Sequence, residues 1–459
     1  MNINLKGGIL AVVLASASPA GLLAQSQPES DANTGASQVD GRTGATQTRS
    51  TEPALKRVFS HLSVGGYGEA VMSRNFYSQH FNRYKYPERY ADDDSHGRFD
   101  LPHVVINLGY DFGYGWTTAM EIEFEHGGTE SAVEMDADES GEYEAETEKG
   151  GEVALEQFWI QKSFFPALNL RAGEIVVPVG ATNAHHLPTE FFTCYRPEGE
   201  ATILPCTWHQ VGISLWGQAA GWRYEAQFLS GLDAERFGAE CFVHYASNSS
   251  YEFKIANKYA AALRVDNNSI DGLRLSLSGY AGRTFRNQLK TPGSKYDDVE
   301  GGLLIGCFDF AFERFGIIAR GNYDIAHLDD ADLITTYNVT YPKHSGQDGT
   351  PSKRQPVAEE AMAAGVEAGY DFFSLSDSRA QRGQRLIVFG RFEHYDSMKK
   401  STNASAYEWC GKNRFALGLN YFPLKEIVVK AEYSKRNLPD QYNDEPSVSL
   451  GIAYSGWFK

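Results

Sequence analysis

The sequence predicts an all-β fold, a transmembrane antiparallel β-barrel of about sixteen strands, and three observations support this prediction. Apolar residues alternate with polar or small residues through most of the chain after residue 60, which is the pattern of strands with one apolar face. The connections between these stretches are alternately short and long. There are sixteen such stretches. An even number of strands brings the end of the last strand back to the rim at which the first strand begins.

Each predicted strand is a stretch in which every second side chain is apolar. Leu273, Leu275 and Leu277, for example, alternate with Arg274 and Ser276. The sixteen stretches are 60–73, 100–112, 115–126, 153–164, 167–176, 208–218, 221–230, 257–266, 271–285, 301–312, 314–326, 359–373, 384–397, 412–422, 425–436 and 446–458.

The connections give the predicted barrel its two different rims. The short connections carry turn residues such as Gly113, Gly115 and Pro166. The long connections are 75–99, 127–152, 177–207, 231–256, 286–300, 327–358, 398–411 and 437–445. Short periplasmic turns and long extracellular loops are typical of bacterial outer-membrane barrels. A soluble all-β sandwich or propeller is the alternative, but such folds do not require connections that alternate in length.

The two ends of the chain differ from the predicted barrel at 56–459. Lys6, the apolar stretch 9–23 and small residues before Gln25 predict a signal peptide at 1–24, with an uncleaved anchor as the alternative. Residues 25–55 are polar and predict a flexible tail. No later run of eighteen apolar residues exists, which excludes a spanning helix there. The chain is therefore expected at the bacterial cell outer membrane.

The long connection 177–207 is the candidate functional segment. It has no lasting strand or helix period, and it is rich in aromatics, prolines and histidines. A connection of this length between two regular strands is usually functional. It also holds two of the five cysteines, and export makes a Cys194–Cys206 disulfide one hypothesis. The spacing alone does not place their Cα atoms within the roughly 7 Å that a disulfide requires.

Three motifs in and after this connection resemble a known family. NAHHLPTEFF (183–192), YRPEGE (195–200) and ILP-x-TWHQ-x-GISLWG (203–217) are similar to the segment that porins of the phosphate-selective porin O/P-like superfamily place between two strands. The closing stretch SVSLGIAYSGWF (447–458) resembles the last strand of that family. The resemblance implies a sixteen-stranded barrel, often a homotrimer, surrounded by outer-membrane lipid and lipopolysaccharide. It also implies that the third long loop, here 177–207, folds into the lumen as a constriction.

The charges on the polar strand faces predict a pore wall of mixed sign. The candidate cations of the wall are Arg171, Arg223, Arg274, Arg283, Arg320, Arg391, Arg414 and Lys430. The same faces carry Glu121, Glu123, Glu125, Glu225, Asp309, Glu367, Glu393 and Glu432. Anion selectivity needs clustered cations along the pore. Because the two sets are about equal, the charges do not favour the phosphate preference that the resemblance implies.

In the loop itself, the candidate constriction residues are Arg196, His185, His186 and His209. One hypothesis is that they form a gate that attracts anions. The alternative is that Arg196 pairs with Glu198 or with a wall carboxylate and fixes the loop. Adjacent histidines diverge on an extended segment and no zinc-type spacing is present, so no metal is expected. The acidic run within 130–148 is expected to be a solvated loop, with binding of Ca²⁺ or Mg²⁺ as the alternative.

The sequence therefore predicts a porin, a water-filled channel for passive diffusion of small hydrophilic solutes or ions, with anions such as phosphate implied by the resemblance. The alternative is a barrel with a plugged lumen that serves as a surface binding or structural protein. No G-x-S-x-G, H-E-x-x-H or Walker pattern is present, so no enzyme is expected. Neither a cofactor nor a nucleic-acid partner is expected.

Overall fold

The computed structural model describes residues 60–80, 82–127, 131–137, 143–149, 151–247, 254–285, 287, 296–340 and 356–458. The predicted signal peptide and polar tail, 1–24 and 25–55, lie outside the described residues. Within the described residues, no helix is both long enough and apolar enough to cross a membrane.

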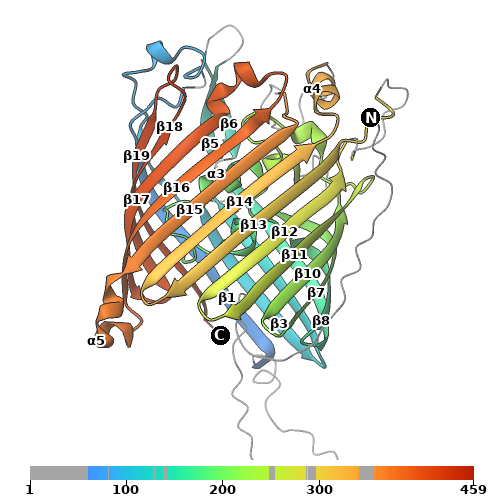
Figure 1. Cartoon of the computed structure of the whole chain (residues 1–459), viewed down its shortest axis with the longest axis vertical. Coiled ribbons are helices and arrows are strands. Elements are labelled where there is room, and N and C mark those ends of the chain that lie inside the picture. Colours follow the sequence, from blue (N-terminus) through green and yellow to red (C-terminus); the bar gives the residue numbers. More distant parts are fainter. Residues whose placement is uncertain are drawn as a thin grey trace, which may run out of the picture.

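The chain forms a closed antiparallel β-barrel whose strands are strongly tilted (Figure 1). Its sixteen strands are β1 (Leu62–Asn75), β3 (His103–Gly113), β4 (Trp116–Glu125), β7 (Glu152–Phe165), β8 (Leu168–Val176), β9 (His209–Ala219), β10 (Trp222–Ser230), β11 (Tyr259–Ile270), β12 (Leu273–Arg283), β13 (Gly302–Arg314), β14 (Ile317–Leu328), β15 (Glu360–Asp371), β16 (Arg385–Lys400), β17 (Gly411–Leu424), β18 (Ile427–Asn437) and β19 (Glu445–Trp457). The first and last strands close the barrel, with Gly65 opposite Trp457 and Asn75 opposite Ser447. The predicted fold class is confirmed.

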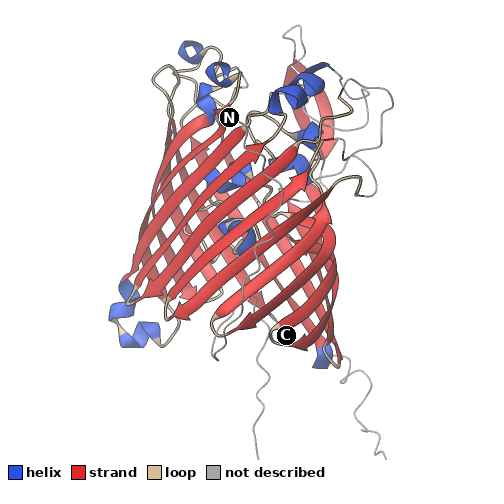
Figure 2. Ribbon diagram, turned by 45° about the vertical axis from the view of Figure 1, so that its right-hand side comes forward, coloured by secondary structure: helices blue, strands red, loops and turns tan. Residues whose placement is uncertain are grey.

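Three further strands lie in the long connections. β2 (Gly97–Asp100) pairs with the outer end of β1, where Val71 is opposite Asp100. β5 (Ser131–Ala137) and β6 (Tyr143–Lys149) form a separate hairpin, which rises beyond the barrel rim (Figure 2). The acidic run that was expected to be a solvated loop therefore lies partly on strands.

Short helices occupy the turns and loops. They are η1 (Pro87–Arg89), α2 (Ala181–Ala184), α3 (Glu198–Ile203), η2 (Ala234–Arg236), η3 (His244–Ser247), α4 (Ala331–Thr340), η4 (Phe372–Leu375), α5 (Asp377–Ala380), η5 (Ala404–Ala406) and η6 (Glu408–Cys410). α2 and α3 belong to the connection 177–207. η4 and α5 lie at the rim of short turns, opposite α4 (Figure 1).

Burial in this barrel is the reverse of burial in a soluble sandwich. Leu263 and Leu277 face outward and keep 59% and 64% of their surface exposed, whereas the neighbouring Arg264 keeps 1%. Outward apolar and inward polar side chains alternate because successive side chains of a strand point to opposite faces. This pattern fits a barrel whose outer surface meets lipid.

A charge placed on this outer surface should destabilise the barrel according to its depth. Leu277 lies in the middle of β12, opposite Val265 and Phe308. We expect Leu277→Arg to cost about 2–4 kcal/mol of the free energy of unfolding in lipid vesicles, because a cation near the bilayer midplane loses its hydration. Leu375→Arg, in η4 at the turn rim, is the matched control and should cost at most about 1 kcal/mol. Equal costs in denaturant unfolding would contradict the placement of β12 across the membrane.

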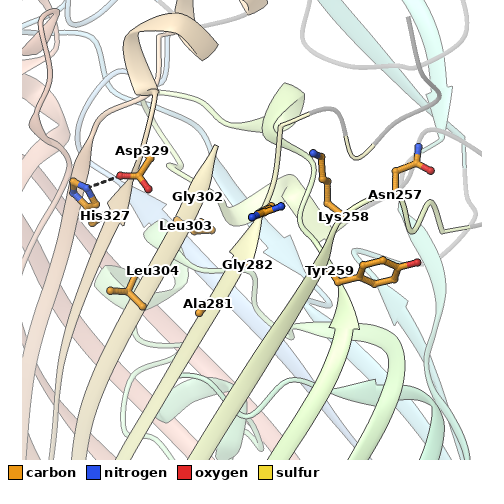
Figure 3. A pocket seen from close by; sticks show the side chains of 11 residues that line it. Asn257, Lys258, Tyr259, Ala281, Gly282, Gly302, Leu303, Leu304, His327 and Asp329 are labelled. Atoms are coloured by element: carbon orange, nitrogen blue, oxygen red, sulfur yellow. Dashed lines mark hydrogen bonds and ion pairs between the residues drawn. The ribbon is translucent and has the colours of Figure 1, made fainter. Parts of the chain in front are cut away.

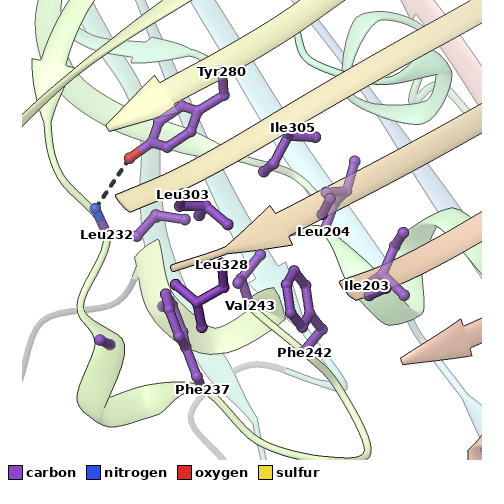
Figure 4. Packing of buried hydrophobic residues seen from close by; sticks show 14 of the residues in the cluster. Ile203, Leu204, Leu232, Phe237, Phe242, Val243, Tyr280, Leu303, Ile305 and Leu328 are labelled. Atoms are coloured by element: carbon purple, nitrogen blue, oxygen red, sulfur yellow. Dashed lines mark hydrogen bonds between the residues drawn. The ribbon is translucent and has the colours of Figure 1, made fainter. Parts of the chain in front are cut away.

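The interior of the barrel is filled in part by apolar side chains from the long connections. Ile203 and Leu204 pack in one buried cluster with Phe242 and with the inward-facing Leu303 and Ile305 of β13 (Figure 4). The backbone N–H of Leu232 donates to the Tyr280 hydroxyl at 3.2 Å within this cluster. Burial of apolar surface, at about 25 cal/mol per Å², therefore holds two long connections against the inner wall.

A second buried cluster forms around Phe192, nearer the rim of short turns. Phe192 packs against the inward side chains of Ile318, Ile387 and Phe389, and its ring centroid lies 5.1 Å from that of Phe389. Ile318 and Ile387 are near the turn ends of β14 and β16. The connection 177–207 thus reaches from the outer half of the lumen towards the opposite rim.

Candidate functional site in the barrel lumen

The loop that crosses the lumen, residues 177–207, is closed at its base by one asparagine. The side-chain N–H₂ of Asn183 donates to the carbonyls of Val179 and Pro205, both at 2.9 Å. Its carbonyl accepts the backbone N–H of Trp208 at 2.8 Å. The backbone N–H of Val177 donates to the Trp208 carbonyl at 2.8 Å. The loop therefore leaves β8 and enters β9 as a closed unit.

The far leg of the loop is held by side chains of β17 and β18. Lys430 donates to the carbonyls of Phe191 and Thr193, at 3.1 and 2.8 Å. Asn420 donates to the carbonyl of Phe192 at 3.0 Å. Two strands, β17 and β18, thus bind three consecutive carbonyls of the loop. These strands lie across the barrel from the loop base, because several strands separate β17 from β8 and β9 in both directions.

Glu198, at the start of α3, joins the loop to the wall by two ion pairs and a hydrogen bond. Its carboxylate pairs with Arg414 at 3.2 Å and with Arg436, and it accepts the Tyr395 hydroxyl. Burial raises the pKa of Glu198, but Arg436 and Arg414 outweigh burial and lower the pKa to about 2. Glu198 is therefore charged at neutral pH and fixes the loop from α3.

The predicted wall cations are paired rather than free. Arg414 also pairs with Glu393 at 2.9 Å, and Arg391 pairs with Glu367 and Glu393, both at 3.0 Å. The remaining pairs are Arg320–Glu367 at 2.7 Å, Arg274–Asp309 at 3.2 Å and Arg223–Glu225 at 2.6 Å, with Arg264, which sequence analysis did not single out, at 3.0 Å from Asp309. In the described wall these arginines do not form an uncompensated ladder of positive charge.

Arg171, Lys430 and Arg283 have other roles. Arg171 donates to Gln161 at 3.0 and 2.9 Å and lies over the Trp159 ring at 4.1 Å. Lys430 binds the loop carbonyls. Arg283 does not face the lumen: its side chain is 66% exposed at the outer rim and lies 3.5 Å from Glu300. It lines a rim hollow of about 630 Å³ between the ends of β11 and β14 (Figure 3).

The loop histidines are positioned by local partners. His185 lies 3.6 Å from Glu190, and His186 packs against the Tyr67 ring. Burial lowers the pKa of both, that of His186 to about 4, so His186 is neutral at pH 7. His209 is the first residue of β9 and lies 2.7 Å from Glu174. These contacts fit a role of the histidines in fixing the loop better than a role as an anion gate.

Arg196 forms neither of the ion pairs that the sequence suggested, with Glu198 or with a wall carboxylate, among the described residues. Glu198, its proposed partner, is bound to Arg414 and Arg436 instead. None of the three guanidinium nitrogens of Arg196 makes a hydrogen bond to a carboxylate of the described residues, although their surfaces are buried. Its charge acts on the carboxylates of Glu123 and Glu156 in the facing wall. Arg196 is therefore the loop cation that faces an acidic part of the lumen.

The structure has Cys194 and Cys206, which one hypothesis joined in a disulfide, as free thiols, like the other three cysteines, all of them within the described residues. The two cysteines lie on different sides of the loop. The backbone of Cys194 donates to Glu432 on β18 at 2.7 Å, whereas the Cys206 thiol lies beside Arg196. Burial raises the pKa of each thiol to about 12.

The acidic part of the wall was only partly recognised from sequence. Glu121 and Glu123 alternate along β4 and were expected to face the lumen. Glu69 on β1 and Glu156 on β7 join them, and all four side chains are at most 5% exposed. Glu156 was missed because a β-bulge opposite Glu121 and Ile122 turns it inward, and such irregularities leave no mark in a simple alternation.

Comparison with known proteins gives relatives for the fold. No family model matches the chain. An uncharacterized protein of Aquifex aeolicus (strain VF5) is 24% identical over 401 residues, which cover 86% of this chain and 80% of that protein. The outer membrane channel DcaP of Acinetobacter baumannii has a TM-score of 0.50 at 10% identity, covering 86% of this chain and 97% of DcaP.

The chain shares the barrel fold of DcaP. Salmonella typhi OmpF, with a TM-score of 0.49 at 10% identity, also covers 86% of this chain and 97% of its own. The anion-selective porin of Comamonas acidovorans has a TM-score of 0.45 at 9% identity, with 86% and 98% covered. These structural neighbours are outer-membrane porins and channels. At such identities the DcaP likeness concerns the shared barrel fold alone.

Proposed function

We propose that this porin-like barrel is a channel of the bacterial outer membrane that passes small hydrophilic solutes or ions by passive diffusion. The observation that carries the proposal is the loop 177–207, which is closed at its base by Asn183 and fixed at α3 by the Glu198 pairs with Arg414 and Arg436. A loop held inside a sixteen-stranded barrel sets the bore of the pore. We further propose export by the 1–24 signal peptide and contact with lipid and lipopolysaccharide.

The finer assignment rests on the sequence motifs. The segments 183–200 and 203–217 support membership of the phosphate-selective porin O/P-like superfamily and, with it, a homotrimer. The charges argue against phosphate as the solute, since the wall arginines are paired. The carboxylates of Glu69, Glu121, Glu123 and Glu156 face the single guanidinium of Arg196. We therefore propose a preference for cations.

Planar bilayers test both parts of this proposal. Wild-type protein should give discrete single-channel currents, and in a KCl gradient the dilute side should become positive because K⁺ crosses faster than Cl⁻. Glu69→Gln combined with Glu121→Gln should move the reversal potential towards zero. Asp271→Asn, at an exposed turn, is the matched control and should leave it unchanged. A negative dilute side, with block by inorganic phosphate, would favour the anion assignment instead.

A second candidate function has its own supporting observation. The inward side chains of Arg264, Asp309, Glu367 and Glu393 are each only 1% exposed, although they face the lumen. Such burial fits a plugged barrel that binds a surface partner or serves as a structural protein. Folded, heat-modifiable protein that inserts into bilayers without any current would support this candidate and exclude the channel.

A further inference from the structure

The inner wall of β1, β3, β4 and β7 brings one imidazole and several carboxylates together beside the loop. His103 Nδ1 lies 2.7 Å from Glu123 and 3.9 Å from Glu125. The ligand atoms of these three residues all lie within 4.8 Å of one another. The edge of a tetrahedral site with metal–ligand bonds of about 2.1 Å is about 3.4 Å. The 2.7 Å contact is a hydrogen bond in this structure, and widening it to about 3.4 Å would let the three groups hold a single ion.

The other nitrogen of the same imidazole faces a different carboxylate. His103 Nε2 lies 3.7 Å from Glu69. A metal-binding histidine usually donates its second ring N–H to a carboxylate, which fixes the tautomer and orients the ring. With a metal ion bound, Glu69 would accept the proton of Nε2 and leave the lone pair of Nδ1 for the ion, in place of the hydrogen bond that Nδ1 makes to Glu123 in this structure.

Independent evidence comes from carboxylate oxygens that lack any partner. Glu156 is 2% exposed, and its Oε2 atom makes no hydrogen bond among the described residues. The same is true of Oε1 of Glu121 and of Oε2 of Glu69. The β-bulge in β7 places Glu156 within hydrogen-bonding reach of Glu123. Burying a carboxylate without a partner costs several kcal/mol, and two carboxylates in contact require a cation or a proton between them.

The loop does not supply the missing cation at contact distance. Arg196 faces this wall, but none of its nitrogens makes a hydrogen bond to a carboxylate of the described residues. It forms no ion pair with Glu123 or Glu156 in the structure. Arg196 therefore makes no contact that pairs with these carboxylates.

We propose that His103, Glu123 and Glu125 bind one divalent transition-metal ion inside the lumen, with Glu69 orienting His103 and Glu156 lying beside Glu123. The donor set selects the class of ion. Imidazole with carboxylates suits ions such as Zn²⁺ and Mn²⁺, whereas Ca²⁺ and Mg²⁺ prefer oxygen ligands alone. His103 is on β3 and Glu123 and Glu125 are on β4, so the bound ion would join two neighbouring strands of the wall next to the loop.

Metal binding to the folded barrel tests this site without reference to channel activity. Untagged full-length protein, folded in detergent and treated with chelator, should bind one Zn²⁺ per chain in equilibrium dialysis, and excess Ca²⁺ should not displace it. Glu123→Gln should abolish this binding. Glu69→Gln should weaken it about 10–100-fold, because an orienting partner typically contributes that much affinity.

The matched control is the second group of the same composition, His327, Glu359 and Glu360. Its carboxylates are only half-buried and are already paired with Lys400 and Lys399, so His327→Gln should leave Zn²⁺ binding unchanged. Loss of binding in His327→Gln, or full binding in Glu123→Gln, overturns the proposal.

X-ray absorption of the Zn²⁺-loaded wild-type protein gives a readout that requires no variant to fold. One imidazole among oxygen ligands is the expected first shell, and sulfur or several imidazoles would overturn the site. Because binding is measured on folded protein in detergent, absence of Zn²⁺ would refute the metal site alone. Absence of bilayer currents would refute the channel alone.

Discussion

Replacing residues 183–203 with a short Gly-Ser linker should raise the single-channel conductance several-fold, since a sixteen-stranded barrel without an inward loop leaves a wide aqueous channel. The deletion removes α3 with Glu198, and it removes Phe192 from the apolar cluster near the opposite rim. Both contacts hold the loop inside the lumen. The strands of the barrel do not depend on them for their backbone hydrogen bonds, so the barrel should still insert into planar bilayers.

Deleting the hairpin 131–149 is the matched control for the loop deletion. β5 and β6 lie beyond the rim (Figure 2), so the conductance should stay at the wild-type value. A loop deletion that leaves the conductance unchanged would contradict the assignment of 177–207 as the constriction.

Glu198→Gln should lower the free energy of unfolding by about 3 kcal/mol, at the lower end of the cost of breaking a buried ion pair. The cost is moderated because Arg414 keeps Glu393 and Arg436 keeps Glu445. Glutamine has the same shape, so the loss reports charge alone. Denaturant unfolding of the folded barrel in detergent measures it. Asp444→Asn breaks the exposed Lys435–Asp444 pair and should cost less than about 1 kcal/mol.

The same residue should give the barrel a defined response to acid. The pKa of Glu198 is about 2 in the folded protein, below the value of about 4.3 for an unfolded glutamate. Its stabilisation is therefore complete above the unfolded value and is lost as the pH falls towards 2. Wild-type and Glu198→Gln barrels should differ most at neutral pH and converge in acid. A difference that grows as the pH falls would contradict the assigned pairing.

The strands could be predicted because their signal is local. Leu273, Leu275 and Leu277 identify one apolar face within five residues. The same two-residue period recurs in strands around the barrel. The position of the loop in the lumen could not be predicted from a local sequence pattern. Glu198 and Arg436 are 238 positions apart, and no spacing rule links them. The resemblance of the motifs predicted an inward loop, while the structure supplied the partners.

The chemistry of the wall was harder to predict for a related reason. Sequence alternation assigned Arg391 and Arg414 to the inner face but could not show that Glu367 and Glu393 compensate them. The bulge in β7 puts Glu156 and Gln157 both on the inner face, so the alternation before it is out of phase with the alternation after it. Sequence spacing also could not decide the hypothesis of a Cys194–Cys206 bridge, because two residues that are near in sequence can contact different parts of the wall, as these two do.

The strand order also determines when the loop can become fixed during assembly. The side-chain hydrogen bonds of Asn183 join Val179, Pro205 and Trp208. These residues are close in the chain, so the hydrogen bonds can form once β8 and β9 pair. Lys430 and Arg436 are supplied by β18, more than 200 residues later, and contacts over such separations form slowly because the intervening chain must first be ordered. An assembling barrel that still lacks its last strands therefore holds a loop with a finished base and a free tip.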